Sequence, residues 1–401
     1  MLSRVFKAFR YRDFRLLWFG ACTSSIGTWM QKVAQSWLVL EISKSPFLLG
    51  LDAFLGEIPI FLFSLLGGVA ADRVERRRIL LASQAVQMSC AFLLAFLILF
   101  ELVHVAHILA LSFVVGLAQS FGGPAYQALI PTLVEKEDLP NAIALNSIQF
   151  NLARVIGPVL GGLALTQLGA AWCFALNGVS FIAVIVSLLL LSIRFVPPKA
   201  AESVLASMKQ GIGFIRRQGT MESLIALAFC MTALAIPMVI FLPVFARDVF
   251  ARGPTTFTIF LACSGAGSVT GALIVAGNSS SWRKGRMALI LLVFLGAGIT
   301  GFALSRSLVL SCVLLFLSGA ALIAVFALVS SLVQLMTSNE MRGRVMSVYN
   351  LAFRGGMPFG SLATGWLVPI FSAPTVLAAN GVILLLLGVY FLTIERRVSA
   401  L

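Results

Sequence analysis

The chain has 401 residues, of which 60% are hydrophobic and only 11% are charged, and its formal net charge is +14. Soluble domains carry about 25% charged residues, so this composition excludes a cytosolic globular enzyme. A membrane-spanning helix needs about 20 apolar residues, so the length allows about a dozen spans and leaves no room for a large soluble domain.

Apolar runs bounded by charged residues, Pro, Gly or Asn predict twelve membrane-spanning helices. The first six cover residues 15–41, 47–71, 78–101, 107–130, 141–167 and 170–194. The other six cover residues 222–246, 256–277, 287–305, 308–336, 344–371 and 375–394. An all-α integral membrane protein is therefore expected. The links at Gly169 and at residues 372–374 are so short that two spans could merge there.

The distribution of Lys and Arg predicts the orientation, because cytoplasmic loops retain positive charge. With the N-terminus inside, the inner segments carry 22 of the 29 basic residues. The outer loops carry four, which are Lys44, Arg247, Arg252 and Arg306. Both termini are therefore expected to be cytoplasmic. The basic residues form short clusters on one side, which suits anionic lipid head groups and argues against a nucleic-acid partner.

The longest hydrophilic stretch divides the predicted spans into two groups of six. It predicts an N-terminal half (1–194), a cytoplasmic linker (195–221) and a C-terminal half (222–401). Apolar residues at helical spacing predict one helix on the inner membrane surface in the linker and another near the N-terminus. These residues are Val204, Leu205, Met208, Ile212 and Ile215 in the linker, and Leu2, Val5, Phe6 and Phe9 near the N-terminus.

The two halves carry similar features at similar positions. A shift of 200 residues places Arg154 on Arg354 and Pro158 on Pro358, and a shift of 210 residues places Gly67 on Gly277, Arg73 on Arg283 and Arg76 on Arg286. Each match is weak alone. Together they indicate a transporter built from repeats, with its binding site where the repeats meet.

The loop after the second span carries a recognisable run of residues. A positive-inside loop explains its arginines, but Asp72 at the helix end can also pair with Arg or with the positive end of a helix. Such a pair would latch one conformation. The run resembles the loop signature of the major facilitator superfamily, with Glu75 in place of the second Gly. The matching residues are Gly68, Asp72, Arg73, Arg76 and Arg77.

The fifth predicted span contains Gly157, Pro158, Gly161 and Gly162. Gly and Pro in a membrane helix allow another helix to approach closely, and a kinked, close-packed helix would explain them without further function. The run resembles the antiporter signature of facilitator-type drug exporters, with Ala153 where the first Gly usually stands. The resemblance favours an exporter over an importer, and implies two six-helix halves that rock around a central cavity.

Three further segments are similar to the branch of the superfamily that contains enterobactin exporters and macrolide efflux proteins. They are Phe14–Glu41, the group formed by residues 123–125, 128–131 and 133–134, and Asn141–Asn151, which leads into Arg154. The resemblance covers the N-terminal half well and the C-terminal half loosely. The fourth predicted span contains no Arg, whereas proton-coupled drug antiporters typically carry one there. Proton coupling would therefore use other residues.

Five ionisable residues fall inside predicted spans, and these are Lys32, Asp52, Glu57, Arg154 and Arg354. Such groups cost at least a few kcal/mol each, so each is a functional hypothesis. Lys32 and Glu57 lie at equal depth, which predicts a pair, while the superfamily resemblance offers Arg354 as a competing partner. We expect Glu57 to couple transport to protons. For Arg154 and Arg354, a structural ion pair is as good an explanation as a functional role. For Asp52, the alternative to a functional role is simple solvation near the outer surface.

A polar stripe on the first span is expected to line a cavity, with contact between helices as the alternative. Further polar or adaptable side chains on three other spans complete the predicted substrate cavity. The residues are Thr28, Gln31, Gln35, Gln149, Asn151, Met231, Tyr349 and Asn350.

These patterns together predict a secondary active exporter of amphipathic organic molecules, of drug or siderophore type. We expect it in the plasma membrane, the inner membrane of a bacterium, as a monomer in contact with lipids that exchanges its cargo for protons. A lipid or lysophospholipid flippase of the same fold is the alternative. A membrane enzyme or sensor is disfavoured, since the six Cys are scattered and only two His are present. No cofactor or metal is expected, and without a GxxxxGK[ST] run the chain should not use ATP.

Overall fold

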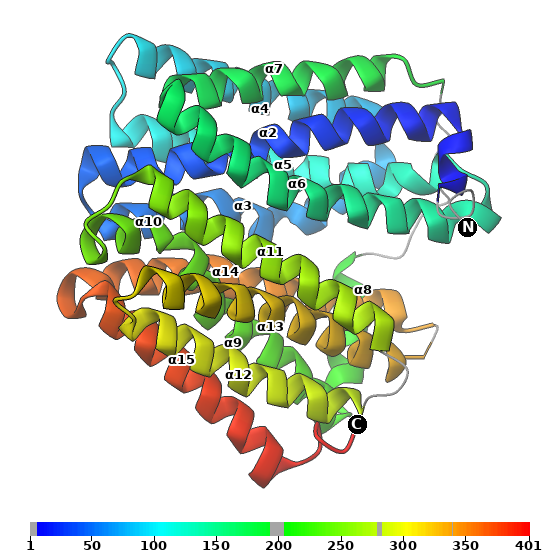
Figure 1. Cartoon of the computed structure of the whole chain (residues 1–401). Helices are drawn as coiled ribbons and strands as arrows, with labels where there is room; N and C mark the ends of the chain where they lie inside the picture. Colours follow the sequence, from blue (N-terminus) through cyan, green and yellow to red (C-terminus); the bar gives the residue numbers. More distant parts are fainter. Residues whose placement is uncertain (1–5, 193–203, 279–282, 339) are drawn as a thin grey trace. The chain divides into compact units, whose positions relative to one another are not determined.

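The computed structural model of the chain describes residues 6–192, 204–278, 283–338 and 340–401 (Figure 1). Within these residues the protein is helical and contains no strand. The prediction of an all-α protein is confirmed, and each of the twelve predicted segments overlaps a long helix in the described part of the chain, although the predicted span 222–246 is divided after Ile240. Leu2 and Val5 of the predicted N-terminal helix lie outside the described residues.

The first part of the chain forms six long helices, with three short 3-10 turns around them. The long helices are α2 (Arg12–Ser43), α3 (Pro46–Arg73), α4 (Arg76–Leu99), α5 (Val105–Leu129), α6 (Leu139–Gln167) and α7 (Ala170–Leu189). The turns are η1 (Lys7–Arg10), η2 (Ile130–Thr132) and η3 (Lys136–Asp138). Helices α6 and α7 remain separate because Gly169 between them has a φ of 90°, which glycine adopts without steric cost.

The second part begins with the linker helix and again forms six long helices. The elements are α8 (Val204–Arg216), α9 (Gly219–Ile240), α10 (Leu242–Val244), η4 (Phe245–Val249), α11 (Pro254–Asn278), α12 (Lys284–Leu304), α13 (Leu308–Leu335), α14 (Arg342–Phe371), α15 (Ala373–Tyr390) and η5 (Phe391–Glu395). Ser372, with a φ of 77°, separates α14 from α15. Neither of the two short links predicted from the sequence has merged into a continuous helix.

Ten of the described helices are long and apolar enough to cross a membrane. Helices α2 and α14 have 32 and 30 residues, which is sufficient length, but their composition is more polar. These two helices also carry Lys32 and Arg354. Charged residues at membrane depth are not confined to these two helices, because Asp52 and Glu57 lie on α3 and Arg154 lies on α6, which are among the ten.

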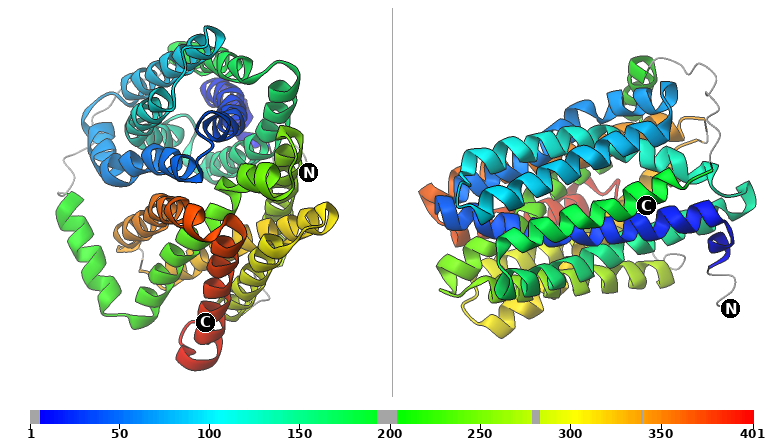
Figure 2. Two further views of the ribbon diagram at one scale, coloured as in Figure 1. Left: turned by 90° about the vertical axis from the view of Figure 1, so that its left-hand side faces the viewer. Right: turned by 90° about the horizontal axis from the view of Figure 1, so that it is seen from above.

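The chain folds into two compact units. The N-terminal unit comprises Met1–Ser43 and Leu55–Ala201, and the C-terminal unit comprises Lys44–Phe54 and Glu202–Leu401. In the N-terminal unit α2 packs along α6 and α7, and α4 packs along α5 and α7. Figure 2 shows these helices running alongside one another, with α2 in dark blue and α7 in green.

Glycines set the helix spacing in the N-terminal unit. A Cβ atom on Gly67 of α3 would collide with the carbonyl oxygen of Ser120 on α5. A Cβ atom on Gly116 of α5 would collide with the carbonyl oxygen of Gly56 on α3. Helices in lipid associate through close van der Waals packing, and small residues allow the backbones to touch.

The C-terminal unit repeats this pattern of pairing. Helix α9 packs along α14, α11 along α13, and α12 along α13 and α15. Gly356 and Gly360 of α14 face Phe229 and Ala233 of α9 so closely that a Cβ atom on either glycine would meet the α9 backbone. The pairing of α9 with α14 corresponds in chain order to that of α2 with α6, the first and fifth long helices of each unit.

The linker helix α8 packs against the first turns of α14. A Cβ atom built on Gly211 would lie 2.8 Å from the carbonyl oxygen of Arg344, and Ile215 is buried. Ile212, by contrast, is exposed. The helix therefore docks on its own unit through one face, and its position on the membrane surface stays a prediction.

Candidate functional site

The glycine motif of α6 is the contact surface for α2. A Cβ atom on Gly157 would collide with the Cβ atom of Trp29 and would lie 2.9 Å from the carbonyl oxygen of Ile26. One on Gly161 would lie 2.8 Å from the carbonyl oxygen of Met30. Pro158 and Gly162 are also buried. The motif thus lets the two backbones approach closely, as expected for small residues in membrane helices.

This close approach assembles a cluster of two cations around one indole ring. The ammonium Nζ of Lys32 lies 5.1 Å from the ring centroid of Trp29, and the guanidinium Cζ of Arg154 lies 5.9 Å from a Trp29 ring centroid. Phe150 packs edge-on against Trp29 with a centroid separation of 6.3 Å. We call Trp29, Lys32, Phe150 and Arg154 the Trp29 cluster. Each helix contributes two members, because i, i+3 and i, i+4 positions share a helix face.

The positive charges of the Trp29 cluster are not balanced by a carboxylate. Among the described residues, neither Lys32 nor Arg154 forms an ion pair within 4.0 Å. The predicted pair of Lys32 with Glu57 is therefore wrong, and the ammonium lies over Trp29 instead. A cation–π contact contributes about 0.5–2 kcal/mol. A charge at the centre of a membrane helix costs about 2.5–3.5 kcal/mol on insertion scales, so the ring alone does not offset both charges.

The polar stripe of α2 forms hydrogen bonds to neighbouring helices. The Asn177 amide of α7 donates to Gln31 Oε1. The Gln35 amide donates to the Ser112 hydroxyl of α5 at 2.8 Å. Both glutamines are half-buried. Gln31 and Gln35 therefore connect neighbouring helices in this structure, which was the alternative interpretation. That they line a cavity stays a prediction.

The other polar cavity candidates of the N-terminal unit are also hydrogen bonded. Gln149 is only 2% exposed and donates to the Ser25 hydroxyl at 2.8 Å. It bridges α6 to α2 from inside the unit. The Asn151 amide donates to the carbonyl of Ser147 at 2.8 Å, and the Thr28 hydroxyl donates to a carbonyl of its own helix at 2.9 Å.

The remaining intramembrane charges lie in different surroundings. Asp52 is 8% exposed, so the alternative of simple solvation is wrong for this carboxylate. It belongs to the part of α3 that folds with the C-terminal unit, whereas Glu57 belongs to the part that folds with the N-terminal unit. Glu57 is half-buried and Arg354 is exposed.

Arginines of the loop motif cap the ends of other helices. Arg76 Nη1 donates to the Ala128 carbonyl at the end of α5 at 2.8 Å, and Arg77 Nη2 donates to the Leu189 carbonyl at the end of α7 at 2.7 Å. Helix C-termini present free carbonyls and partial negative charge, which cations stabilise. The predicted partner for Asp72 is present but distant, since Arg76 lies 3.9 Å away and the aspartate side chain is 51% exposed.

Of the two adjacent glycines near the end of α3, Gly67 packs against another helix and the motif residue Gly68 does not. A Cβ atom on Gly68 would meet nothing within 4 Å, whereas one on Gly67 would collide with the α5 backbone. Arg73 is exposed. Which of the two glycines faces α5 depends on the rotation of α3, which the sequence does not specify.

In the C-terminal unit two predicted cavity residues lie in the core. Met231 is 1% exposed and Tyr349 is 0% exposed, whereas Asn350 is exposed. The first two are buried in the core of the C-terminal unit in this structure, and the lining of a substrate cavity by these three residues stays a prediction. The Tyr349 ring stacks on Phe353 at a centroid distance of 6.3 Å. Within the described residues its hydroxyl has no hydrogen-bond partner.

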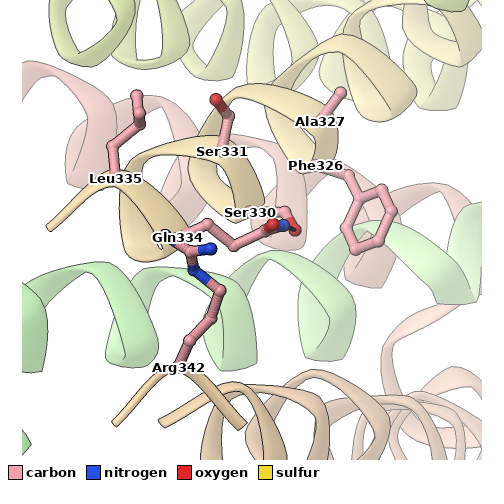
Figure 3. A pocket seen from close by; sticks show the side chains of 7 residues that line it. All are labelled: Phe326, Ala327, Ser330, Ser331, Gln334, Leu335 and Arg342. Atoms are coloured by element: carbon pink, nitrogen blue, oxygen red, sulfur yellow. Dashed lines mark hydrogen bonds between the residues drawn. The ribbon is translucent and has the colours of Figure 1, made fainter. Parts of the chain in front are cut away.

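A pocket of about 400 Å³ lies at the C-terminal end of α13, beside the start of α14 (Figure 3). Its lining residues are Phe326, Ala327, Ser330, Ser331, Gln334, Leu335 and Arg342. None of these seven side chains is acidic, and the Lys284 ammonium donates to the Ser331 hydroxyl at 3.3 Å. This pocket was not predicted from the sequence, although three polar residues close the end of an otherwise apolar span.

A buried carboxylate fastens the N-terminal segment to the η3 turn. Asp138 is 1% exposed, and its oxygens lie 2.7 Å from Lys7 Nζ and 2.9 Å from Arg10 Nη2. The Tyr11 hydroxyl donates to the same carboxylate at 2.9 Å. The hydrogen bond from Lys7 holds the pKa of Asp138 below its ordinary value, and the hydrogen bond from Tyr11 and the positive charge of Arg10 act in the same direction. The sequence analysis did not identify this group.

Asp138→Asn is expected to lower the thermal unfolding temperature at pH 7, because the amide cannot pair with Lys7 and Arg10. A carboxylate with a lowered pKa contributes stability above its unfolded pKa, which is 3.8, and loses it as pH falls through the folded value. The difference from the native chain should therefore disappear in acid. Glu135→Gln is the control, since that carboxylate is 65% exposed and pairs at the surface. An equal difference at pH 7 and in strong acid would contradict the assignment.

Comparison with known proteins identifies the family. The model of the transmembrane secretion effector family matches residues 3–400. The multidrug efflux pump Tap of Mycolicibacterium fortuitum is 26% identical over 392 residues, which is 95% of each chain. The enterobactin exporter EntS of Shigella boydii serotype 4 is 27% identical over 388 residues, which is 95% of this chain and 91% of EntS.

Solved structures of transporters share the fold. A bacterial homologue of the human lysosomal transporter Spinster superposes with a TM-score of 0.76 at 16% identity, over 96% of this chain and 97% of the homologue. The nucleoside transporter NupG superposes with a TM-score of 0.72 at 14% identity, over 96% and 99% of the two chains. The resemblance found in the sequence is confirmed. The chain belongs to the transmembrane secretion effector family of the major facilitator superfamily and is a multi-span membrane transporter.

Proposed function

We propose that the chain is a secondary active exporter of amphipathic organic molecules that exchanges its cargo for protons. The observation that carries the proposal is the placement of charged side chains on α2 and α6, at membrane depth, in a chain whose relatives are named as an efflux pump and an exporter. Charges inside a membrane are costly and typically mark a substrate or ion pathway. The similarity to Tap and EntS supports the outward direction.

The proposed architecture has twelve spans, both termini in the cytoplasm, and a site in the plasma membrane, the inner membrane of a bacterium. Helices α2 and α14 complete the ten apolar spans, since each packs closely against an apolar helix of its own unit. Residues 1–194 and 222–401 form the two halves that alternate access, and residues 195–221 link them on the cytoplasmic side. The transporter acts as a monomer.

Two features support the proposed conformational cycle. The carboxylate of Asp72 is half exposed and lies 3.9 Å from Arg76, so it is available to a partner in another conformation. Glu57 is half-buried at membrane depth on α3. A carboxylate whose surroundings differ between two states binds protons differently in each, which lets a proton gradient drive the cycle. We assign the latch to Asp72 and the proton coupling to Glu57.

The test is transport into inverted membrane vesicles. A panel of labelled amphipathic compounds is offered with an imposed proton gradient, and again after a protonophore has dissipated it. At least one compound should accumulate only with the gradient and only in vesicles that contain the chain. The absence of gradient-dependent flux for every compound would contradict the proposal. Movement of a labelled lysophospholipid between leaflets, without accumulation of any soluble compound, would support a flippase instead.

A further inference from the structure

The Trp29 cluster has a chemistry that the proposed export of amphipathic molecules does not by itself explain. Two positive side chains from different helices face one indole ring, at 5.1 Å for Lys32 and 5.9 Å for Arg154. The described part of the chain places no acidic side chain within ion-pair distance of either. The alternative interpretation of Arg154 was a structural ion pair that locks the fold. Such a pair needs an acidic partner, and this arrangement provides none among the described residues.

The cluster is also accessible. Lys32 is exposed, and Trp29 and Arg154 are half-buried. Arg154 presents a planar fork of donors suited to the two oxygens of an acidic group, and Lys32 provides a second, more flexible charge. The rings of Trp29 and Phe150, packed edge to face at 6.3 Å, supply an apolar surface beside these charges. The four side chains together present an acid-binding group next to an aromatic platform.

The position of the cluster is fixed by the backbone. Gly157, one turn beyond Arg154 on α6, packs directly on Trp29. The two backbones that carry Arg154 and Trp29 are therefore held at a fixed separation, which keeps the guanidinium within reach of the indole. A site whose charges are held in place before the ligand arrives binds that ligand with less ordering cost.

We propose that the Trp29 cluster binds the acidic group of the exported molecule, so that the cargo is an amphipathic anion with an aromatic or apolar body. The inference rests on the proposed export function and specifies its substrate class. Carboxylates, sulfonates and ionised phenols share the required chemistry. The acidic group pairs with Arg154 and Lys32, and the apolar body lies against Trp29 and Phe150.

The experiment measures equilibrium binding to the purified full chain in nanodiscs and needs no gradient. The probes are anilinonaphthalene sulfonate and phenylnaphthylamine, two fluorescent dyes with the same aromatic body, of which only the first is anionic. The native chain should bind the sulfonate more tightly than the neutral dye. The double variant Lys32→Gln with Arg154→Gln should lose about ten- to hundred-fold in affinity for the sulfonate, as expected for charged hydrogen bonds, and retain its affinity for the neutral dye.

A second double variant, Lys44→Gln with Arg252→Gln, removes the same charge from exposed positions outside the cluster. It should bind both dyes like the native chain, and Lys32→Arg should retain sulfonate binding. The proposal is overturned if the cluster variant binds the sulfonate normally, or if both dyes lose affinity equally. The cluster variant could bind the sulfonate normally while the native chain exports a neutral or cationic compound with the gradient. That result would reject the proposed substrate class but would still support export. Absence of all flux would instead contradict export.

Discussion

Gly157→Ala is expected to lower the unfolding temperature and to impair transport, although it adds a single methyl group. That methyl would collide with the Trp29 side chain and would lie 2.9 Å from the Ile26 carbonyl oxygen. The backbone of α2 cannot yield by a side-chain rotation, so the helices must separate. Overpacking of this kind costs about 1–3 kcal/mol. The separation would also withdraw Arg154 from Trp29, so substrate affinity should fall together with stability.

The control is Gly123→Ala on α5, where the added methyl would meet nothing within 4 Å. Alanine is favoured over glycine in a helix by about 1 kcal/mol, so this variant should be as stable as the native chain or more so. Thermal unfolding in detergent and vesicle transport would measure both effects. Native stability and native transport in Gly157→Ala would show that contact between α2 and α6 is not essential.

Glu57→Gln is expected to remove the dependence of transport on the proton gradient. Glutamine keeps the size of the side chain but cannot take up or release a proton, so the gradient can no longer bias one state over the other. Accumulation in inverted vesicles should fall to the level measured with the protonophore. Exchange of labelled for unlabelled cargo without a gradient should continue, because Glu57 is not among the residues proposed to bind the cargo.

Glu101→Gln provides the matched control for this experiment, since Glu101 is an exposed carboxylate in the turn between α4 and α5. It should transport like the native chain at every pH. Glu57→Asp keeps a titratable group at the same position, so it should restore the dependence of accumulation on the proton gradient. Unchanged accumulation and unchanged pH dependence in Glu57→Gln would assign the coupling to another residue.

The sequence predicted the helices well, because lipid imposes a strong requirement on length and composition. The predicted span 308–336 is α13 at Leu308–Leu335, for example. The predicted span 222–246 does not continue as one helix, since α9 ends at Ile240 and two short helical segments follow. Pro237 and Pro243 lie on either side of this break, and each removes a backbone donor from the helical ladder.

Single site residues were visible in the sequence, whereas their partners were not. Lys32 and Arg154 were found as charges in apolar runs, but their common contact with Trp29 depends on how α2 and α6 are rotated. Equal depth wrongly suggested Glu57 as the partner of Lys32, because depth does not specify which face of a helix a residue occupies. Asp138 was missed for another reason, because its partner Lys7 is more than 100 positions earlier in the chain.

The arginines that cap α5 and α7 link membrane insertion to assembly. In the proposed topology, positive residues near the start of α4 help to orient the chain as it enters the membrane. Arg76 and Arg77 bind carbonyls of residues that are synthesised after them. Arg77, for example, binds the carbonyl of Leu189, which follows it by 112 residues. The start of α4 therefore stays incomplete until α7 has been synthesised and inserted. A lysine at position 77 would preserve the insertion signal but lack the planar fork that reaches both Leu189 and Leu191. Such a chain would keep the positive charge and hold the end of α7 through fewer hydrogen bonds, at a cost of about 1 kcal/mol.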